Sequence, residues 1–252
     1  MGQRVKGVVR YDGTGFAGWQ VQPGARTVQA VIEEKLALIA GAPVRIAASG
    51  RTDSGVHALG QVISFDWAAD VPLERVRRSL SQMLSPEVRV ERLKPAADDF
   101  HATYSAVAKT YAYCISEARD ADPFLDRYVW SVPWEIDREL VRGLLSRIVG
   151  EHDFAGFCSS GSSVETTVRT IHAAEVVDGP VVGPVDAVDT WHIRYTGNGF
   201  LYKMVRNLTG TIIDIARGHL AESALDERLN APMPYAGFSA PAKGLFLVEV
   251  QY

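Results

Sequence analysis

The chain of 252 residues contains only two cysteines, Cys114 and Cys158, and they lie far apart in the sequence. No Cys-x-x-Cys pair and no cysteine–histidine pair at a metal-binding spacing occurs, so neither a disulfide framework nor a zinc site is predicted. The six histidines are scattered without the spacing of a metal centre. Both cysteines are expected to be buried apolar side chains, and no bound metal ion is expected.

Long hydrophobic runs are also missing from the chain. No segment approaches the roughly 20 consecutive apolar residues that a membrane-spanning helix needs. Residues 1–6 lead directly into a strand pattern and lack the apolar core of a signal peptide. These absences predict a soluble protein of the cytoplasm with no membrane partner.

The sequence has no phosphate-binding P-loop, no dinucleotide glycine fingerprint and no excess of positive charge. Its formal net charge is -4, which by itself argues mildly against a nucleic-acid partner. The charge is uneven, because residues 1–105 carry 13 lysines and arginines against 11 acids, and residues 106–252 carry 13 against 19. A phosphate-binding surface is therefore expected to be a local patch, in one subunit or shared between two.

The apolar residues that are present follow strand and helix periods, and these predict an α+β fold in two halves. Residues 1–105 show the order β-α-β-β-α-β, and residues 106–252 show it again without obvious sequence repetition. The predicted strands cover residues 5–11, 44–48, 61–67, 88–93, 109–116, 167–177, 190–195 and 245–252. The predicted helices cover residues 27–41, 72–84, 137–149, 201–216 and 222–229.

This order predicts two ferredoxin-like (RRM-like) halves, each with helices on one face of an antiparallel sheet. If the two sheets join edge to edge, their helix-free face becomes a long cleft that suits an extended polymer such as RNA. The N-terminal half, residues 1–105, would carry the polar loop at residues 50–57, which is the candidate catalytic loop. The C-terminal half, residues 106–252, would complete the site.

Residues 50–57 read Gly-Arg-Thr-Asp-Ser-Gly-Val-His and concentrate an acid, a base, a hydroxyl and an imidazole between two predicted strands. In the plainest interpretation they form a surface turn in which Asp53 caps a backbone N–H and Arg51 is solvated. Alternatively, Asp53 is a nucleophile or base, because Arg51 can keep its carboxylate ionised. Gly50 and Gly55 would let the backbone bend around it. Local composition does not separate these two interpretations.

Two further groups of residues are candidates for RNA binding or catalysis. Lys203 and Arg206 lie one turn apart in the last long predicted helix, where they can face a phosphate, face a carboxylate or remain solvated. Tyr111 and Tyr113 point to one side of a predicted strand. Their rings can stack on bases across an open sheet face or pack in the core.

Several short blocks follow one another from residue 8 to the C-terminus. They comprise residues 11–14 (Tyr-Asp-Gly-Thr), 18–20 (Gly-Trp-Gln), 50–57, 100–102 (Phe-His-Ala), 109–113 (Lys-Thr-Tyr-Ala-Tyr), 150–154 (Gly-Glu-His-Asp-Phe), 200–207 and 241–245 (Pro-Ala-Lys-Gly-Leu). Together these blocks resemble the TruA family of tRNA pseudouridine synthases.

The resemblance implies an isomerase that converts uridine to pseudouridine in the anticodon stem-loop of tRNA. It also implies a homodimer without a metal ion or organic cofactor. The family's nucleophilic aspartate falls on Asp53, its active-site tyrosine on Tyr111 and its cation near the aspartate on Arg206. Arg51 matches the arginine that helps displace the target base. The chain departs from the family pattern at Ser54, where alanine is more usual, and the effect of this hydroxyl on Asp53 is left open.

The residues themselves leave two other functions and one mechanistic choice open. A non-catalytic RNA binder would carry an RNP-type Gly-Phe-Gly-Phe run, which the chain lacks. A retaining glycoside hydrolase would need a second carboxyl about 5 Å from Asp53, and none lies near it in sequence. For a pseudouridine synthase, the carboxylate can add to the uracil ring or assist departure at the sugar C1′, and the sequence does not choose.

Overall fold

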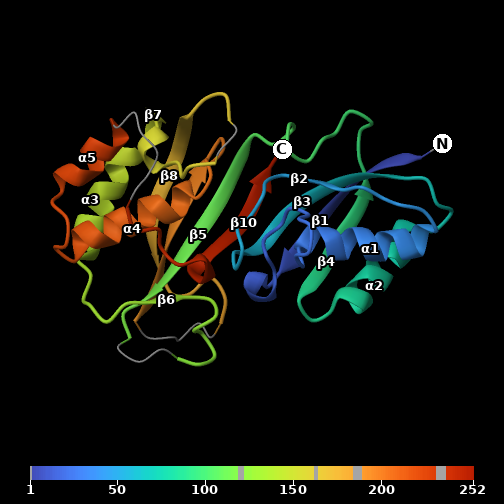
Figure 1. Cartoon of the computed structure of the whole chain (residues 1–252), viewed down its shortest axis with the longest axis horizontal. Helices are drawn as coiled ribbons and strands as arrows, with labels where there is room; N and C mark the ends of the chain where they lie inside the picture. The colour runs from blue at the N-terminus through green and yellow to red at the C-terminus, as the bar shows by residue number, and fades with distance from the viewer. Residues whose placement is uncertain (1, 119–121, 162–163, 184–188, 231–236) are drawn as a thin grey trace. The chain divides into compact units, whose positions relative to one another are not determined.

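The structure is a computed structural model that describes residues 2–118, 122–161, 164–183, 189–230 and 237–252 (Figure 1). Its contacts group the chain into two compact units. Unit 1 comprises Met1–Val107 and Phe246–Tyr252, and unit 2 comprises Ala108–Leu245. The C-terminal residues therefore pack with the N-terminal part of the chain, although the whole of unit 2 separates them in sequence.

Unit 1 has the predicted order β-α-β-β-α-β, followed by the C-terminal strand. Its elements are β1 (Gln3–Tyr11), the short helix η1 (Gly13–Gly15), α1 (Val28–Ala40), β2 (Ala47–Ala48), β3 (His57–Trp67), α2 (Leu73–Leu84), β4 (Val88–Pro95) and β10 (Leu245–Gln251). β1 lies between β3 and β4 and is antiparallel to both. β2 pairs with β3 in antiparallel fashion, and β10 pairs with β3 in parallel.

Local sequence signals explain the helices of unit 1. The Thr27 side chain accepts a hydrogen bond from the Ala30 N–H and caps α1, and Gly41 ends the helix in the left-handed conformation. α2 buries one apolar stripe, and it packs against α1 and β4 on the same side of the strands (Figure 1). On β1, buried Val5 and Val9 alternate with half-buried Lys6, which lies on the other face.

Unit 2 contains the remaining elements. They are β5 (Ala108–Ser116), β6 (Trp130–Ser131), α3 (Arg138–Ile148), β7 (Gly150–Asp153), η2 (Ala155–Phe157), β8 (Val168–Asp178), β9 (Thr190–Gly197), α4 (Met204–Ala216), α5 (Ser223–Leu229) and η3 (Ala242–Gly244). The strand order is β5-β9-β8-β7, all antiparallel, and β6 pairs with β5 in parallel. Figure 1 shows α3, α4 and α5 gathered together, and contacts link α3 to α4 and α4 to α5.

Several element boundaries differ from the predicted ones. The predicted strand 44–48 is reduced to β2, whereas β3 starts at His57 and so includes residues assigned to the loop. α4 begins at Met204 rather than residue 201, because Lys203 has a φ of 59° and cannot belong to a right-handed helix. β6 and β7 were not predicted, since strands of two and four residues are too short to show a period.

Both cysteines are buried free thiols, as expected, and burial raises the pKa of Cys114 to about 12. Among the described residues, no helix is long and apolar enough to cross a membrane.

Candidate functional site

Asp53 lies in the loop of residues 49–56, here called the aspartate loop, which joins β2 to β3 in unit 1. The Val56 N–H donates to the Asp53 carbonyl oxygen at 3.1 Å, which closes a tight turn around the aspartate. Gly55 has a φ of 79°, a conformation that glycine adopts without strain. The turn thus holds the backbone on the C-terminal side of Asp53.

Two glycines of the segment that follows β1 pack directly on the aspartate loop. A Cβ on Gly13 would lie 2.0 Å from the Val56 carbonyl oxygen. A Cβ on Gly18 would lie 2.8 Å from the Thr52 carbonyl oxygen, and Gly18 has a φ of 91°. Residues 11–14 and 18–20, two of the short blocks noted in the sequence, therefore pack against the backbone of the aspartate loop. Only glycine permits two backbones to lie this close.

Buried polar side chains fasten the N-terminal side of the loop. The Tyr11 hydroxyl lies 2.8 Å from the Thr52 hydroxyl, and both side chains are buried. The Gln61 amide donates to the Gly50 carbonyl oxygen at 2.8 Å and accepts from the Ser49 hydroxyl at 2.6 Å. Burial raises the pKa of Tyr11 to about 12, although its hydrogen bonds to Thr52 and Gln61 oppose the shift. The loop is consequently held on both sides of Asp53.

Within this rigid loop, the two candidate residues remain accessible. Arg51 is exposed and Asp53 is half-buried, whereas Thr52 between them is buried. The hydroxyl of Ser54 donates to the Phe16 carbonyl oxygen at 3.1 Å. Ser54, where alanine is more usual, therefore adds a hydrogen bond between the aspartate loop and the segment that contains Phe16.

His57 is the first residue of β3, and its ring packs inside unit 1. Its ring is buried, stacks on Phe246 at a centroid distance of 4.7 Å and accepts a 3.0 Å hydrogen bond from the Gly13 N–H at Nδ1. The same Nδ1 lies 3.3 Å from an oxygen of the Asp12 carboxylate. These contacts link the start of β3 to Phe246 of β10 and Gly13 of η1.

The tyrosine pair on β5 splits into two different environments in unit 2. Tyr111 retains 8% exposure and meets Phe200 edge-on, with a centroid distance of 5.2 Å. Tyr113 is completely buried, and its hydroxyl donates to the Pro241 carbonyl oxygen at 2.7 Å. The interpretation of both rings as stacking groups on an open face is wrong for Tyr113, because β5 is buried along nearly its whole length. Tyr113 is a core residue.

The two predicted cations at α4 also differ. Lys203 stands just before the helix, with its ammonium 5.1 Å from the centroid of the Tyr202 ring. Arg206 lies in the first turn of α4, and its Nε donates to the Ala240 carbonyl oxygen at 2.8 Å. The Ala240 N–H donates back to the Arg206 carbonyl oxygen at 3.1 Å. Arg206 thus fastens the segment that precedes η3 to α4.

Sequence reasoning missed two cations near Tyr111. Lys109 precedes Tyr111 by two residues on β5, so both side chains lie on one face. Burial lowers the pKa of Lys109, and the positive charge of Arg169 on β8 lowers it further. Burial also lowers the pKa of Arg169. The spacing from Lys109 to Tyr111 was visible in the sequence, but the approach of Arg169 depends on strand pairing.

A buried asparagine on α4 was also missed. Asn207 is wholly buried and donates to the Phe157 carbonyl oxygen at 2.8 Å and to the Ser159 hydroxyl at 3.2 Å. The Ser239 hydroxyl donates to the Asn207 side-chain oxygen. In the sequence, the position of polar Asn207 among the apolar residues of the predicted helix could have indicated a buried hydrogen-bonding side chain. Its amide joins two loops to the first turn of α4.

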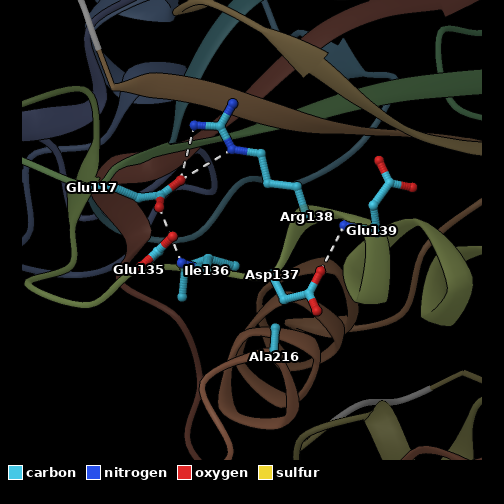
Figure 2. A pocket seen from close by; sticks show the side chains of 7 residues that line it. All are labelled: Glu117, Glu135, Ile136, Asp137, Arg138, Glu139 and Ala216. Carbon is cyan, nitrogen blue, oxygen red and sulfur yellow. Dashed lines mark hydrogen bonds and ion pairs between the residues drawn. The ribbon is translucent and has the colours of Figure 1, made fainter.

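A hollow of about 630 Å³ occurs elsewhere in unit 2, beside the start of α3 (Figure 2). It is lined by Glu117, Glu135, Ile136, Asp137, Arg138, Glu139 and Ala216. Figure 2 shows Arg138 directed at Glu117, to which its Nη2 donates at 2.9 Å. Asp137 caps α3. Glu117, Arg138 and Asp137 thus have partners within the hollow, and its four acids would repel an anionic substrate.

The candidate residues are therefore distributed over both units. Unit 1 brings Arg51 and Asp53 together on the aspartate loop, and unit 2 holds Tyr111, Lys203 and Arg206. In the described parts of the chain, no group of three or more histidine, cysteine or acidic side chains is placed to bind a metal ion.

Comparison with known proteins shows which protein family the sequence of this chain matches. The chain matches the family model described as tRNA pseudouridine synthase over residues 8–105 and 145–252. It is 41% identical to tRNA pseudouridine synthase A of an Exiguobacterium species, over 99% of this chain and 98% of the relative. The proteins of the same name from Listeria monocytogenes and Geobacillus kaustophilus are 39% and 41% identical, over 99% and 100% of this chain and 99% and 95% of the relatives.

A solved structure of an H/ACA RNP bound to a substrate RNA containing 2'-deoxyuridine aligns with a TM-score of 0.36 and 12% identity. The alignment covers 83% of this chain and 43% of that one. At these values the likeness carries no detail about the present fold.

Proposed function

The chain belongs to the TruA family of tRNA pseudouridine synthases, and from this premise we propose that it isomerises uridine to pseudouridine in the anticodon stem-loop of tRNA. The matched ranges include Arg51, Asp53, Lys203 and Arg206. Tyr111 lies between those ranges, in a part of the chain that the full-length relatives cover.

The structure of the aspartate loop is the observation that supports Asp53 as the nucleophile. A reacting carboxylate must be accessible, yet its position must be fixed before the substrate arrives. Asp53 is half-buried, and hydrogen bonds hold the residues on both sides of it. A turn with a purely structural role would have no need for this combination of rigidity and access.

The proposed reaction rearranges bonds within one nucleotide. The bond between the sugar C1′ and the uracil N1 breaks, the base turns, and C1′ bonds to C5. The proton on C5 is lost and N1 gains a proton, so atoms and electrons balance without an oxidant, a reductant or an organic cofactor. Asp53 supplies its carboxylate either to the uracil ring or to C1′. The target base must leave its stack first, and in this proposal the exposed Arg51 side chain fills the gap that the base leaves.

The unit 2 residues complete the proposed site. By the family resemblance, Tyr111 would stack on the displaced base or accept the C5 proton, and Arg206 would correspond to the family's cation near its aspartate. Lys203 binds RNA phosphate.

We further propose the finer architecture that the family implies: ferredoxin-like halves at residues 1–105 and 106–252, with joined sheets and an RNA-binding cleft on the helix-free face. The order β4-β1-β3, with β2 beside β3, supports this architecture for the first half. We also propose that the protein is a homodimer and that it works in the cytoplasm.

The test is to incubate the purified protein with unmodified tRNA and to map pseudouridine chemically. Asp53→Asn should abolish product while leaving tRNA affinity within a few fold, because the amide keeps the size of the side chain but is not a nucleophile. Asp70→Asn is the matched control, since Asp70 is exposed on the same unit. Product formation by Asp53→Asn would remove Asp53 from the nucleophilic role.

The same assay distinguishes the two rival functions. A non-catalytic RNA binder would bind tRNA without forming pseudouridine. A glycoside hydrolase would release sugar from a model glycoside and leave tRNA unchanged.

A further inference from the structure

Tyr104 is a large aromatic side chain that unit 1 leaves 85% exposed. Its ring stacks on His101 with a centroid distance of 4.4 Å and an interplanar angle of 26°. Most large aromatic side chains of a soluble domain bury their rings, whereas this pair is stacked in place at the surface. The outer ring is available to a further flat partner.

Hydrogen bonds fix the turn that carries this pair. The His101 ring accepts at Nδ1 from the N–H groups of Thr103, at 3.2 Å, and Tyr104, at 3.4 Å. The His101 N–H donates to the Ser105 hydroxyl at 3.1 Å, and the Ser105 N–H donates to the His101 carbonyl oxygen at 2.9 Å. The turn is therefore ordered before any partner binds, which lowers the entropic cost of binding.

The same turn is fastened to the two strands that flank the aspartate loop. The Thr103 hydroxyl donates to the carbonyl oxygen of Ala48, the last residue of β2, at 2.6 Å. The Ala102 N–H donates to the hydroxyl of Ser64 on β3 at 3.1 Å. The stacked pair and Asp53 consequently belong to one connected framework within unit 1.

Positive charges gather on the face of unit 1 over which this segment runs. Arg4 donates to the Phe100 carbonyl oxygen at 2.8 Å and forms an ion pair with Asp66 at 3.1 Å, so its charge is partly balanced. Lys6 lies on the same face and is opposite Lys94 of β4. Arg92 precedes Lys94 by two residues and therefore lies on that face as well. Burial and the charges of Lys94 and Arg92 lower the pKa of Lys6. Like charges directly opposite each other destabilise a sheet, so this arrangement favours an anionic partner.

Resting on the function proposed above, we infer that Tyr104, stacked on His101, is a platform for an unpaired base of the RNA substrate. Phosphates of the same strand bind the exposed Arg92 and Lys94, which lie beside Lys6 and its contact with the Tyr252 ring. An exposed aromatic ring and a set of cations on one domain are the combination that binds single-stranded RNA, because a base supplies a flat face and the backbone supplies negative charge. A protein partner would not need the row of cations.

The platform is tested by the affinity of single-stranded and duplex RNA oligonucleotides, measured by fluorescence anisotropy. Tyr104→Ala should weaken binding of the single strand roughly tenfold, the effect expected for losing one stacked base. Tyr104→Phe should bind like the parent protein. Phe124→Ala is the matched control, because Phe124 is 84% exposed in unit 2, and its affinity should not change.

The charge component is tested separately by the salt dependence of the same binding. Lys94→Gln should weaken binding and reduce the slope of log K against log salt by about 0.7, the value for one phosphate contact on a single strand. Lys35→Gln, at a lysine paired with Glu34, should leave the slope unchanged.

Equal affinity of Tyr104→Ala and the parent for single-stranded RNA would overturn the inference. So would an equal loss for duplex RNA, or a change of oligomeric state in Tyr104→Ala, which would make the ring a subunit contact. These assays need no turnover. If Tyr104→Ala weakens RNA binding but the parent forms no pseudouridine, the proposed function fails and the platform stands. If the parent forms pseudouridine but Tyr104→Ala binds single-stranded RNA as tightly as the parent, only the platform fails.

Discussion

Gly18 lies against the backbone of Thr52, the residue before the candidate nucleophile, so closely that a methyl group on Gly18 would come within 2.8 Å of the Thr52 carbonyl oxygen. The neighbouring Trp19 N–H donates to the same oxygen at 3.0 Å. The position of Asp53 is thus set by a segment more than thirty residues earlier in the chain.

We predict that Gly18→Ala lowers turnover strongly, because the added methyl group must displace the backbone on which Asp53 stands. A misplacement of about 1 Å is enough to cost roughly a hundredfold in rate. Gly24→Ala is the matched control, since Gly24 also has a positive φ, of 72°, but no atom lies within 4 Å of its Cβ position. Steady-state kinetics and urea unfolding of both variants separate displacement of the loop from backbone strain, and equal rates for the two would contradict the prediction.

Ser54→Ala should retain turnover within a few fold of the parent protein. The hydroxyl bonds the Phe16 carbonyl oxygen, and its loss should lower the free energy of unfolding by about 1 kcal/mol or less, as expected for one partly exposed hydrogen bond. Kinetics and urea unfolding check both parts. A large fall in turnover without a fall in stability would show that the hydroxyl acts on the reaction.

The Tyr11 phenol should make stability fall at high pH. Its pKa is raised from 10.0 to about 12, so between these values the folded protein keeps a proton that the unfolded chain has lost. The free energy of unfolding therefore falls as pH rises through this range, by about 1.4 kcal/mol per unit, and the contribution is intact below it.

Tyr11→Phe removes this titration, so its stability should fall less than that of the parent between about pH 9 and about pH 11, with a difference of roughly 1 kcal/mol. Urea unfolding at the two pH values measures this difference. Tyr113 and Tyr195, whose pKa values burial also raises, are present in both proteins and cancel. Parallel stability curves for the two proteins would disprove the assignment to Tyr11.

Tyr113→Phe should mainly lower stability, whereas Tyr111→Phe should mainly lower turnover. Tyr113→Phe leaves the Pro241 carbonyl oxygen without its 2.7 Å donor and should lower the free energy of unfolding by roughly 1 to 2 kcal/mol. Tyr111→Phe keeps the ring and its contact with Phe200 and should lower turnover more than stability. Full activity in Tyr111→Phe would exclude its hydroxyl as the proton acceptor.

Local sequence signals were sufficient to predict the α+β class, most of the elements and the location of the candidate nucleophile. These features depend on local signals: periods of apolar residues, the Thr27 cap and Gly41 stop of α1, and the dense polar stretch at residues 50–57. The sequence also supplied the resemblance to a family that the comparisons confirm.

Which of these signals concern the site depends on how distant segments pack together. The glycines Gly13 and Gly18 resemble ordinary turn residues in sequence, and their contact with the aspartate loop exists only when the loop packs on their backbone. Tyr111 and Tyr113 share one strand face, yet their different burial depends on what packs against each ring. Such contacts join residues far apart in the chain, and no local period encodes them.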